Sequence, residues 1–310
     1  PIKAPVLRRS PSAGDRLRPG RALGLWEESG ESRGALRCNV LTNGTYSVMS
    51  TSAGSSLSRC GDILMYAPPD PQLGTKGMEF FLDIGGEIFP LLPEGGSGGY
   101  SHTQRLSAVS VRRGELCAEI VTELCADCSG ERRTVRISGA GGLSGAVLTV
   151  TMRPAMAFYN DYVNHPAFYG LGLHAMRTGN EIVLRRLRRG RLDECFLCVT
   201  GGSEFAASLS EDSACGRNRA RDQESGWLVR PELRLDIPLR FSGGCCEARV
   251  CLGFGASEGD ARRCAAAAME LKDADAASLP ELSAALLGLD AAGVGGAGDI
   301  LSAVMFPRAE

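Results

Sequence analysis

The amino-acid sequence predicts a mainly β protein, a large antiparallel β-sandwich followed by short C-terminal linker helices. Apolar and polar side chains alternate with a period of two in several short segments. Gly-rich or polar stretches separate those segments, and the pattern becomes helical after residue 256. Alternation of this kind is typical of a strand with one buried and one solvated face. Because no long helical segment lies between the strands, antiparallel pairing is favoured over a parallel sheet.

The clearest strand covers residues 233–241, where apolar side chains alternate with polar ones and with Pro238. Similar alternation begins near residues 118, 148 and 248. Proline has no backbone N–H to donate to a neighbouring strand, so we expect the 233–241 strand to lie near a sheet edge or a bulge.

The breaks between strands are PEGGSGGY (93–100), SGAGGLSG (138–145) and FSGGCC (241–246). The second has the composition of a phosphate-binding loop, but it lacks the Walker lysine and no helical pattern follows it. We therefore interpret it as a turn between strands.

The C-terminal part has a helical pattern. Ser257 with Asp260 resembles a capping box before an Ala-rich run that ends near Leu271, and a second box begins at Ser278. Asp299 could cap a third helix, which the end of the sequence interrupts, so we expect a piece of a longer protein. The expected organisation is an irregular lead-in over 1–37, a β-sandwich domain over 38–256, and linker helices over 257–310.

Charge and hydropathy argue against two classes of partner. The 34 basic and 36 acidic side chains among 310 residues leave a formal charge of −2, so we expect neither nucleic acid nor an anionic membrane as a partner. No apolar run approaches the roughly 18 residues of a membrane span, and the first ten residues lack the apolar core of a secretion signal. We expect a cytoplasmic location and no membrane contact by this segment.

Twelve cysteines raise the question of metal or disulfide chemistry. Cys125 and Cys128, like Cys195 and Cys198, have the spacing of zinc ligands, but both pairs lie in strand-like segments without the turn that such a site usually shows. The favoured interpretation is buried thiols in a reducing cytoplasm, with neither metal nor cofactor. Zinc remains the alternative.

The segment 152–170, MRPAMAFYNDYVNHPAFYG, concentrates aromatic rings in a chain that is only 6% aromatic. Rings such as Tyr159 can stack on sugar faces, and side chains such as Asp161 can bind hydroxyls. The alternative is a loop whose rings close one end of the sandwich. His165 could act as a general base, but Pro166 favours an extended, structural role for it.

Two basic segments have different interpretations. LRRLRRGR (184–191) is short and lacks aromatic residues, so it predicts the solvated face of a hairpin. Arg217 and Arg219 lie at a Gly turn, where their guanidinium groups could bind carboxylates or sugar hydroxyls, or form structural ion pairs.

The segment 40–62 contains an Asn43-Gly44 hairpin turn, a strand, and a loop of small residues that ends in Arg59 and Asp62. NVLTNGTYSVMSTSAGSSLSRCGDI (39–63) resembles the opening of the β-sandwich in cyclic β-1,2-glucan synthases and glycoside hydrolase family 94 phosphorylases, also described as glycosyltransferase 36-like. Further similar motifs follow in the same order: RPAMAFYNDYVNHPAFYGLGLHA (153–175), CGRNRARD (215–222), LRLDIPLRF (233–241) and ILSAVMFP (300–307).

The resemblance implies a galactose-mutarotase-like supersandwich that packs against an (α/α)6 barrel. The catalytic acids of the family lie in that barrel, so the resemblance implies no catalytic residue here. It implies instead a domain that shapes the cleft for a β-linked glucan or oligosaccharide, with a possible homodimer contact. The implied substrate-binding residues are Arg59, Asp62, Tyr159, Asp161, His165, Arg217 and Arg219.

The chain departs from the family at the 55–67 loop. Ser56-Leu57 and Cys60 stand where the family has Gly-Tyr and Trp, so two candidate stacking rings are missing. Glycosyl transfer needs two carboxyl groups at a defined separation, about 5 Å for retention, and the sequence indicates no convincing pair. Two alternatives stay open: a free-standing sugar-binding module and a structural dimerisation scaffold.

Overall fold

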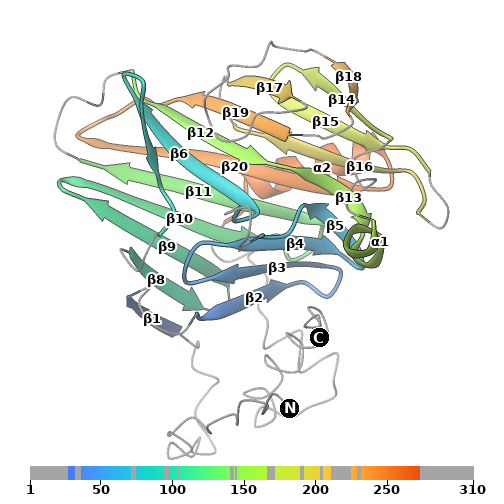
Figure 1. Cartoon of the computed structure of the whole chain (residues 1–310), viewed down its shortest axis with the longest axis horizontal. Coiled ribbons are helices and arrows are strands. Elements are labelled where there is room, and N and C mark those ends of the chain that lie inside the picture. The colour runs from blue at the N-terminus through green and yellow to red at the C-terminus, as the bar shows by residue number, and fades with distance from the viewer. Residues whose placement is uncertain are drawn as a thin grey trace, which may run out of the picture.

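The protein is mainly β, as the sequence predicted, with three antiparallel sheets (Figure 1). The computed structural model describes residues 27–31, 36–70, 75–93, 98–103, 105–139, 143, 145–165, 172–188, 192–202, 205–210, 225–228 and 232–272. All three sheets lie within these residues.

The largest sheet has ten strands. In spatial order they are β1 (Glu27–Glu31), β8 (Gly98–Thr103), β9 (Leu106–Arg113), β10 (Leu116–Leu124), β11 (Gly130–Ser138), β20 (Cys245–Gly255), β16 (Cys195–Thr200), β15 (Glu181–Arg186), β14 (Leu173–Thr178) and β18 (Ser225–Leu228). Strand β1 lies inside the predicted irregular lead-in, where it pairs with β8.

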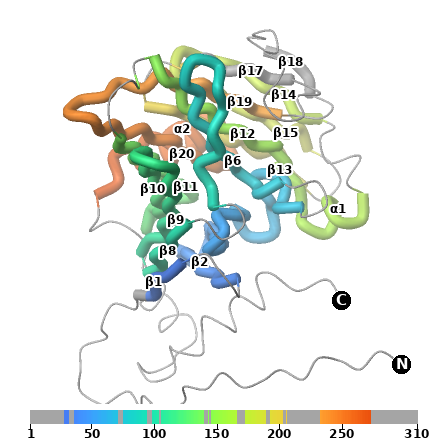
Figure 2. The backbone as a smooth tube through the Cα atoms, turned by 60° about the vertical axis from the view of Figure 1, so that its left-hand side comes forward, coloured from blue at the N-terminus to red at the C-terminus, as the bar shows by residue number. Residues whose placement is uncertain are grey.

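Two five-stranded sheets cover one face of this sheet. The first contains β17 (Ala206–Ser210), β19 (Glu232–Pro238), β12 (Val147–Met152), β6 (Met78–Ile84) and β7 (Glu87–Pro90). The second contains β13 (Pro154–Phe158), β5 (Ile63–Tyr66), β4 (Ser56–Cys60), β3 (Tyr46–Thr51) and β2 (Cys38–Thr42). In Figure 2, β13 lies on the opposite side of the view from β8 to β11.

Alternate side chains of strand β20 point to opposite faces of the ten-stranded sheet. Val250 and Leu252 belong to the main hydrophobic core between the sheets, whereas Cys251 belongs to a small cluster on the other face. Helix α2 (Glu258–Met269) covers that other face. Within the described residues, the two five-stranded sheets form one layer, the ten-stranded sheet the next, and helix α2 a third.

Helix α2 begins as the sequence predicted. The Ser257 side chain accepts a hydrogen bond from the backbone N–H of Asp260 at 3.1 Å, which satisfies one of the free donors of the first turn. The hydroxyl of Ser257 also donates to the Asp260 carboxylate at 2.7 Å. The second and third predicted helices lie outside the described residues.

Helix α2 approaches the sheet very closely because glycines face it. A Cβ atom on Gly253 would lie 2.2 Å from both the Ala261 carbonyl oxygen and the Ala265 nitrogen. A Cβ atom on Gly130 would lie 2.6 Å from the Cys264 carbonyl oxygen. Side chains at these positions would push the helix away, so the glycines determine its distance from the sheet.

The expectation that Pro238 lies near a sheet edge agrees with its local surroundings. Strand β19 lies between β17, the end strand of this sheet, and β12. Pro238 is tolerated because it is the last residue of the strand and lies beyond the part that pairs with β17, which reaches only Asp236. The SGAGGLSG segment leads into strand β12, not into a helix, as its interpretation as a turn requires.

Candidate functional site

Arg59, Asp62 and Tyr159 meet at the turn between β4 and β5. The Arg59 guanidinium donates to the Asp62 carboxylate at 2.7 Å, and its central carbon lies 5.8 Å from the centroid of the Tyr159 ring. The backbone N–H of Tyr159 donates to the Asp62 carbonyl oxygen at 3.0 Å. An ion pair, a cation–π contact and a backbone hydrogen bond thus join segment 39–63 to segment 153–175, two of the segments that resemble the glycoside hydrolase family.

Helix α1 (Tyr159–Asn164) is brought to this corner by an irregularity in β13. The pairing of β13 with β5 shifts register between Pro154 and Ala157. Between them, Met156 is fully buried with φ of 43°, a left-handed conformation that is strained for a residue with a side chain. The bulge redirects the chain so that α1 begins beside Asp62.

The corner contains both buried and exposed groups. Arg59 exposes only 8% of its side chain, whereas Asp62 exposes 82%. Tyr159 and Tyr162 pack partly against the apolar cluster of Leu57, Leu64 and Ala155. The ring of Tyr159 therefore serves packing as well as the contact with Arg59, as the alternative interpretation of a closing loop proposed.

Asp161 and His165 lie near this corner and are exposed. Asp161 is in the first turn of α1, and its carbonyl oxygen accepts the backbone N–H of His165 at 2.9 Å. His165 ends the helix with φ of −138°, outside the helical region, as the following proline requires. Arg217 and Arg219 lie outside the described residues.

A buried polar network lies beneath the corner, on the other face of β4. The Ser58 hydroxyl donates to the Glu131 carboxylate at 2.6 Å and lies 2.9 Å from the Tyr66 hydroxyl. The Tyr66 hydroxyl lies 3.1 Å from that of Ser56. The Arg133 guanidinium donates to the Tyr66 hydroxyl at 3.2 Å and to the Glu131 carboxylate at 3.4 Å. Charged and hydroxyl side chains therefore bridge the two sheets.

Burial determines the ionisation of this network. It raises the pKa of Tyr66 to about 12, and burial followed by the nearby Glu131 carboxylate raises the pKa of Tyr46 well above its ordinary value. Burial alone would lower the pKa of Arg133, but Glu131 raises it. Both tyrosines stay protonated at neutral pH, and Arg133 lies in a buried salt bridge with Glu131 at 3.4 Å.

A small cavity of about 10 Å³ adjoins the network. Its polar lining includes Ser50, Ser56, Thr122 and Arg133. The hydroxyl of Ser50 and the Nε of Arg133 are buried without a protein partner. The space suits about one water molecule, which would bind these two groups.

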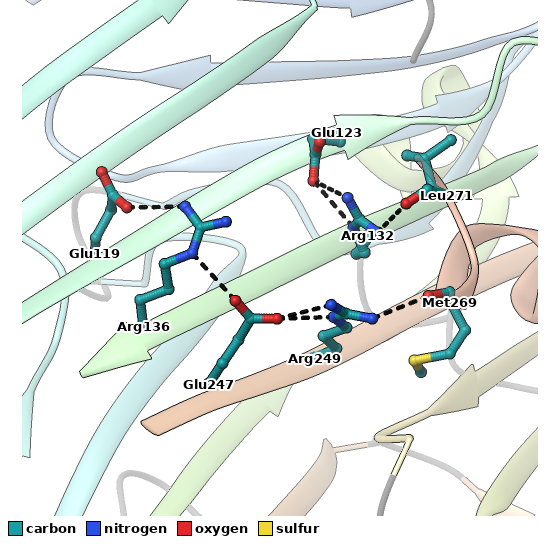
Figure 3. Close-up of polar contacts among 8 residues, drawn as sticks. All are labelled: Glu119, Glu123, Arg132, Arg136, Glu247, Arg249, Met269 and Leu271. Carbon is teal, nitrogen blue, oxygen red and sulfur yellow. Dashed lines mark hydrogen bonds and ion pairs between the residues drawn. The ribbon is translucent and has the colours of Figure 1, made fainter. Parts of the chain in front are cut away.

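A second set of charges lies on the outer face of the ten-stranded sheet (Figure 3). Arg136 pairs with Glu119 and with Glu247, each at 3.2 Å, and Glu247 pairs with Arg249 at 2.8 Å. Burial would raise the pKa of Glu247, but hydrogen bonds from Arg249 and Arg136 lower it. These groups form an exposed ladder across β10, β11 and β20.

The end of α2 is held by two arginines of this face (Figure 3). Arg249 donates to the Met269 carbonyl oxygen at 3.5 Å, and Arg132 donates to the Leu271 carbonyl oxygen. Arg132 also forms a buried ion pair with Glu123 at 2.7 Å. Cationic groups at the C-terminal end of a helix donate hydrogen bonds to its free carbonyls and interact favourably with its dipole. The sheet therefore fixes the position of the C-terminal end of α2.

Sequence reasoning missed the Glu131-Arg132-Arg133 segment. Three consecutive charged residues usually indicate a solvated strand, because charged side chains are seldom fully buried unless they are paired. The signal that could have found it is the position of this charged run, shortly after the strand-like pattern of 116–124, where a second strand of a hairpin would lie. Period two then places Glu131 and Arg133 on one face and Arg132 on the other.

The described residues contain neither a candidate metal cluster nor a helix that could span a membrane. No group of three or more His, Cys, Asp or Glu side chains there has the geometry to hold a metal ion. None of the helices described has the length and apolar character of a membrane span.

Comparison with known proteins gives distant structural likeness only. No protein-family model matches the sequence, and no curated protein matches it. The chain is similar to a bacterial glucoamylase complexed with acarbose, at 8% identity and a TM-score of 0.47 over 89% of this chain and 40% of that one. It is similar to a protein named as an aldose 1-epimerase from Escherichia coli K12, at 9% identity and a TM-score of 0.40 over 71% of this chain and 99% of that one. A protein named as a kojibiose phosphorylase from human microbiome is 10% identical, with a TM-score of 0.38 over 84% of this chain and 34% of that one. The chain thus spans less than half of the glucoamylase and of the phosphorylase.

Proposed function

We propose that this chain is a non-catalytic sugar-cleft domain of a carbohydrate-active enzyme that acts on β-linked glucans. The parent enzyme would be a phosphorylase or a transglycosylase, with its catalytic acids in an (α/α)6 domain. The observation that carries the proposal is the contact of Arg59 with Asp62 and Tyr159. This contact joins the 39–63 and 153–175 segments, which the resemblance to glycoside hydrolase family 94 assigns to the substrate side of the sandwich.

The chemistry of the corner suits binding better than catalysis. The Asp62 carboxylate is held in an ion pair by the Arg59 guanidinium at 2.7 Å and exposes 82% of its side chain, which suits a positioned acceptor. An ionised, exposed carboxylate is an acceptor for sugar hydroxyls. Tyr159 supplies an aromatic face beside it, and Asp161 a second exposed carboxylate.

The orientation of α2 supports a role beside a second domain. Arg132 and Arg249 hold the carbonyls of residues 271 and 269, at and just after its end. A catalytic domain that follows α2 would therefore be attached to a fixed point of the sandwich. The sandwich would then complete one wall of the substrate cleft.

Titration of the chain with linear β-1,2-glucan oligosaccharides, followed by amide chemical shifts in NMR, tests the binding role. We expect weak, millimolar binding with shifts at residues 59–62 and 157–165, lost in Tyr159→Ala. Tyr100→Ala is the control, because Tyr100 is a partly buried tyrosine on β8, in another sheet. Shifts elsewhere, or equal loss in both variants, would count against the site.

The non-catalytic role is tested separately by incubating the chain with the same glucans, with and without inorganic phosphate. We expect no sugar phosphate and no change in chain length. Turnover that disappears in Asp161→Asn would overturn the assignment.

A further inference from the structure

Arg186, the last residue of β15, is a charged side chain in the interior of the sandwich. The sequence predicted a solvated face for the segment 184–191, which is wrong for Arg186: this residue is only 2% exposed. Ile182 and Leu184, on the same face of β15, belong to the main hydrophobic core. Because charged side chains are seldom fully buried without a specific partner, the burial of Arg186 indicates a defined role.

The partner of Arg186 lies across the interior, in the β-bulge of β13. The Arg186 guanidinium donates to the Ala155 carbonyl oxygen at 2.6 Å. The pairing of β13 with β5 is irregular between residues 154 and 157, so Ala155 and Met156 lie outside the regular ladder. A buried carbonyl in such a place needs a donor from elsewhere, and Arg186 supplies one.

The same bulge contains a strained backbone conformation. Met156 is fully buried with φ of 43°, which a residue with a side chain adopts only where the surrounding structure enforces it. The Ala155 carbonyl belongs to the planar peptide group that precedes Met156, and the orientation of this group determines that φ. The hydrogen bond from Arg186 therefore holds the peptide group on which the conformation of the bulge depends.

Tyr159 follows the bulge directly, since β13 ends at Phe158 and α1 begins at Tyr159. The backbone N–H of Tyr159 donates to the Asp62 carbonyl oxygen at 3.0 Å, and the Arg59 guanidinium carbon lies 5.8 Å from its ring centroid. A bulge sets both the register and the direction of the strand that follows it. The bulge thus determines whether Tyr159 reaches Asp62.

We propose that Arg186 is a positioning residue of the corner formed by Arg59, Asp62 and Tyr159. Its hydrogen bond to the Ala155 carbonyl holds the bulge in the conformation that presents Tyr159 to Asp62. Arg186 is buried and touches no sugar, so it acts through β13. Its consequence for sugar binding rests on the proposed function, whereas its effect on the corner does not.

Amide hydrogen exchange in the free chain, followed by NMR, tests the positioning role. Arg186→Met removes the donor and keeps a side chain of similar length, and replacing a buried charge with an apolar side chain of similar volume is often tolerated. We expect the Tyr159 amide to exchange at least about tenfold faster, because its hydrogen bond to Asp62 opens more often.

Two further variants at this position complete the test. Arg186→Gln has no charge and an amide too short to span the distance to Ala155, so it should give the same result and replaces Arg186→Met if that variant does not fold. Arg186→Lys keeps the charge and a donor. It should return the exchange rate of the Tyr159 amide to within about threefold of the wild type.

The matched control combines Arg132→Met with Glu123→Gln. Arg132 is also a buried arginine that donates to a backbone carbonyl, that of Leu271, and the second substitution avoids leaving a buried carboxylate unpaired. The control should leave the Tyr159 amide as protected as in the wild type. Unchanged exchange of this amide in Arg186→Met would overturn the proposal. Equal acceleration in the control would also overturn it, because it would reflect global destabilisation.

Titration of the same variants with linear β-1,2-glucan oligosaccharides distinguishes failure of the positioning role from failure of the proposed function. We expect Arg186→Met to bind at least about fivefold more weakly than the wild type, and the control to bind as the wild type does. If the wild-type chain binds no glucan while the Tyr159 amide responds to Arg186→Met, the proposed function fails and the positioning role stands. Equal glucan affinity of Arg186→Met and the wild type would overturn the positioning role.

Discussion

The guanidinium of Arg132 donates to the backbone carbonyl of Leu271, two residues beyond the end of α2, while it forms a buried ion pair with Glu123. One side chain on β11 thereby neutralises a buried carboxylate and fixes the start of the segment that follows the helix. Both roles depend on burial, since each partner would otherwise be hydrated.

Arg132→Ala should destabilise the chain strongly, because it leaves the buried Glu123 carboxylate without a counter-charge. Loss of one partner of such a pair costs about 3–5 kcal/mol in the free energy of unfolding. Urea unfolding followed by circular dichroism measures this. Arg136→Ala is the control: its ion pairs are exposed, and we expect a loss below about 1 kcal/mol. Equal losses in the two variants would show that burial does not determine how much an ion pair contributes to the free energy of unfolding.

Gly253→Ala should displace α2, since the added Cβ atom would lie 2.2 Å from the backbone of the helix. We expect a loss of at least about 2 kcal/mol in the free energy of unfolding, in the range of an overpacked core. Gly259→Ala, within the same helix, is the matched control. Its Cβ atom would lie 3.9 Å from the Ser257 hydroxyl, so the change should be neutral or stabilising by up to about 1 kcal/mol. A neutral Gly253→Ala would contradict the close packing.

Tyr66→Phe should destabilise the interior network, because its hydroxyl contacts those of Ser56 and Ser58 and accepts from Arg133. Removing it leaves buried partners unsatisfied, at a cost of about 1–3 kcal/mol. Tyr100→Phe serves for comparison, since that hydroxyl forms a longer, partly exposed hydrogen bond to Glu28 at 3.3 Å. Thermal unfolding of the two variants should differ clearly, and equal melting temperatures would show that the network contributes little.

Acidification should destabilise the chain through His102. This side chain is fully buried, and its Nδ1 lies 2.9 Å from the Ser107 hydroxyl. Burial lowers the pKa of His102, although Glu28 opposes the shift. The neutral form is therefore favoured in the folded state, so its contribution is complete above the unfolded pKa near 6.5 and is lost as pH falls through the lower folded value.

The measurement for His102 is the urea midpoint at a series of pH values from 8 to 5, in the wild-type chain and in His102→Gln. The wild-type midpoint should fall more steeply below about pH 6.5 than that of the variant. Parallel curves would show that other groups account for the acid dependence.

Local patterns in the sequence were sufficient to predict some of the secondary-structure elements. The alternation at 233–241 predicted β19, and Ser257 with Asp260 predicted the start of α2, because side-chain period and capping depend on near neighbours. The Asn43-Gly44 turn is likewise local. Gly44 has φ of 88°, and the Asn43 side chain accepts from the backbone N–H of Tyr46 at 2.8 Å.

Partners across the fold were decided only by the tertiary structure. No pattern near Asn43 indicates that its amide clamps the turn at Cys125 and Cys128, and nothing near Arg59 indicates that it lies against Tyr159, because these partners are far apart in the sequence. The same holds for Glu131 and Arg133, whose burial depends on which sheet covers them. The period of two along a strand determines the face on which a residue lies, but the arrangement of the sheets and the helix determines whether that face meets solvent, a counter-charge or another packed element.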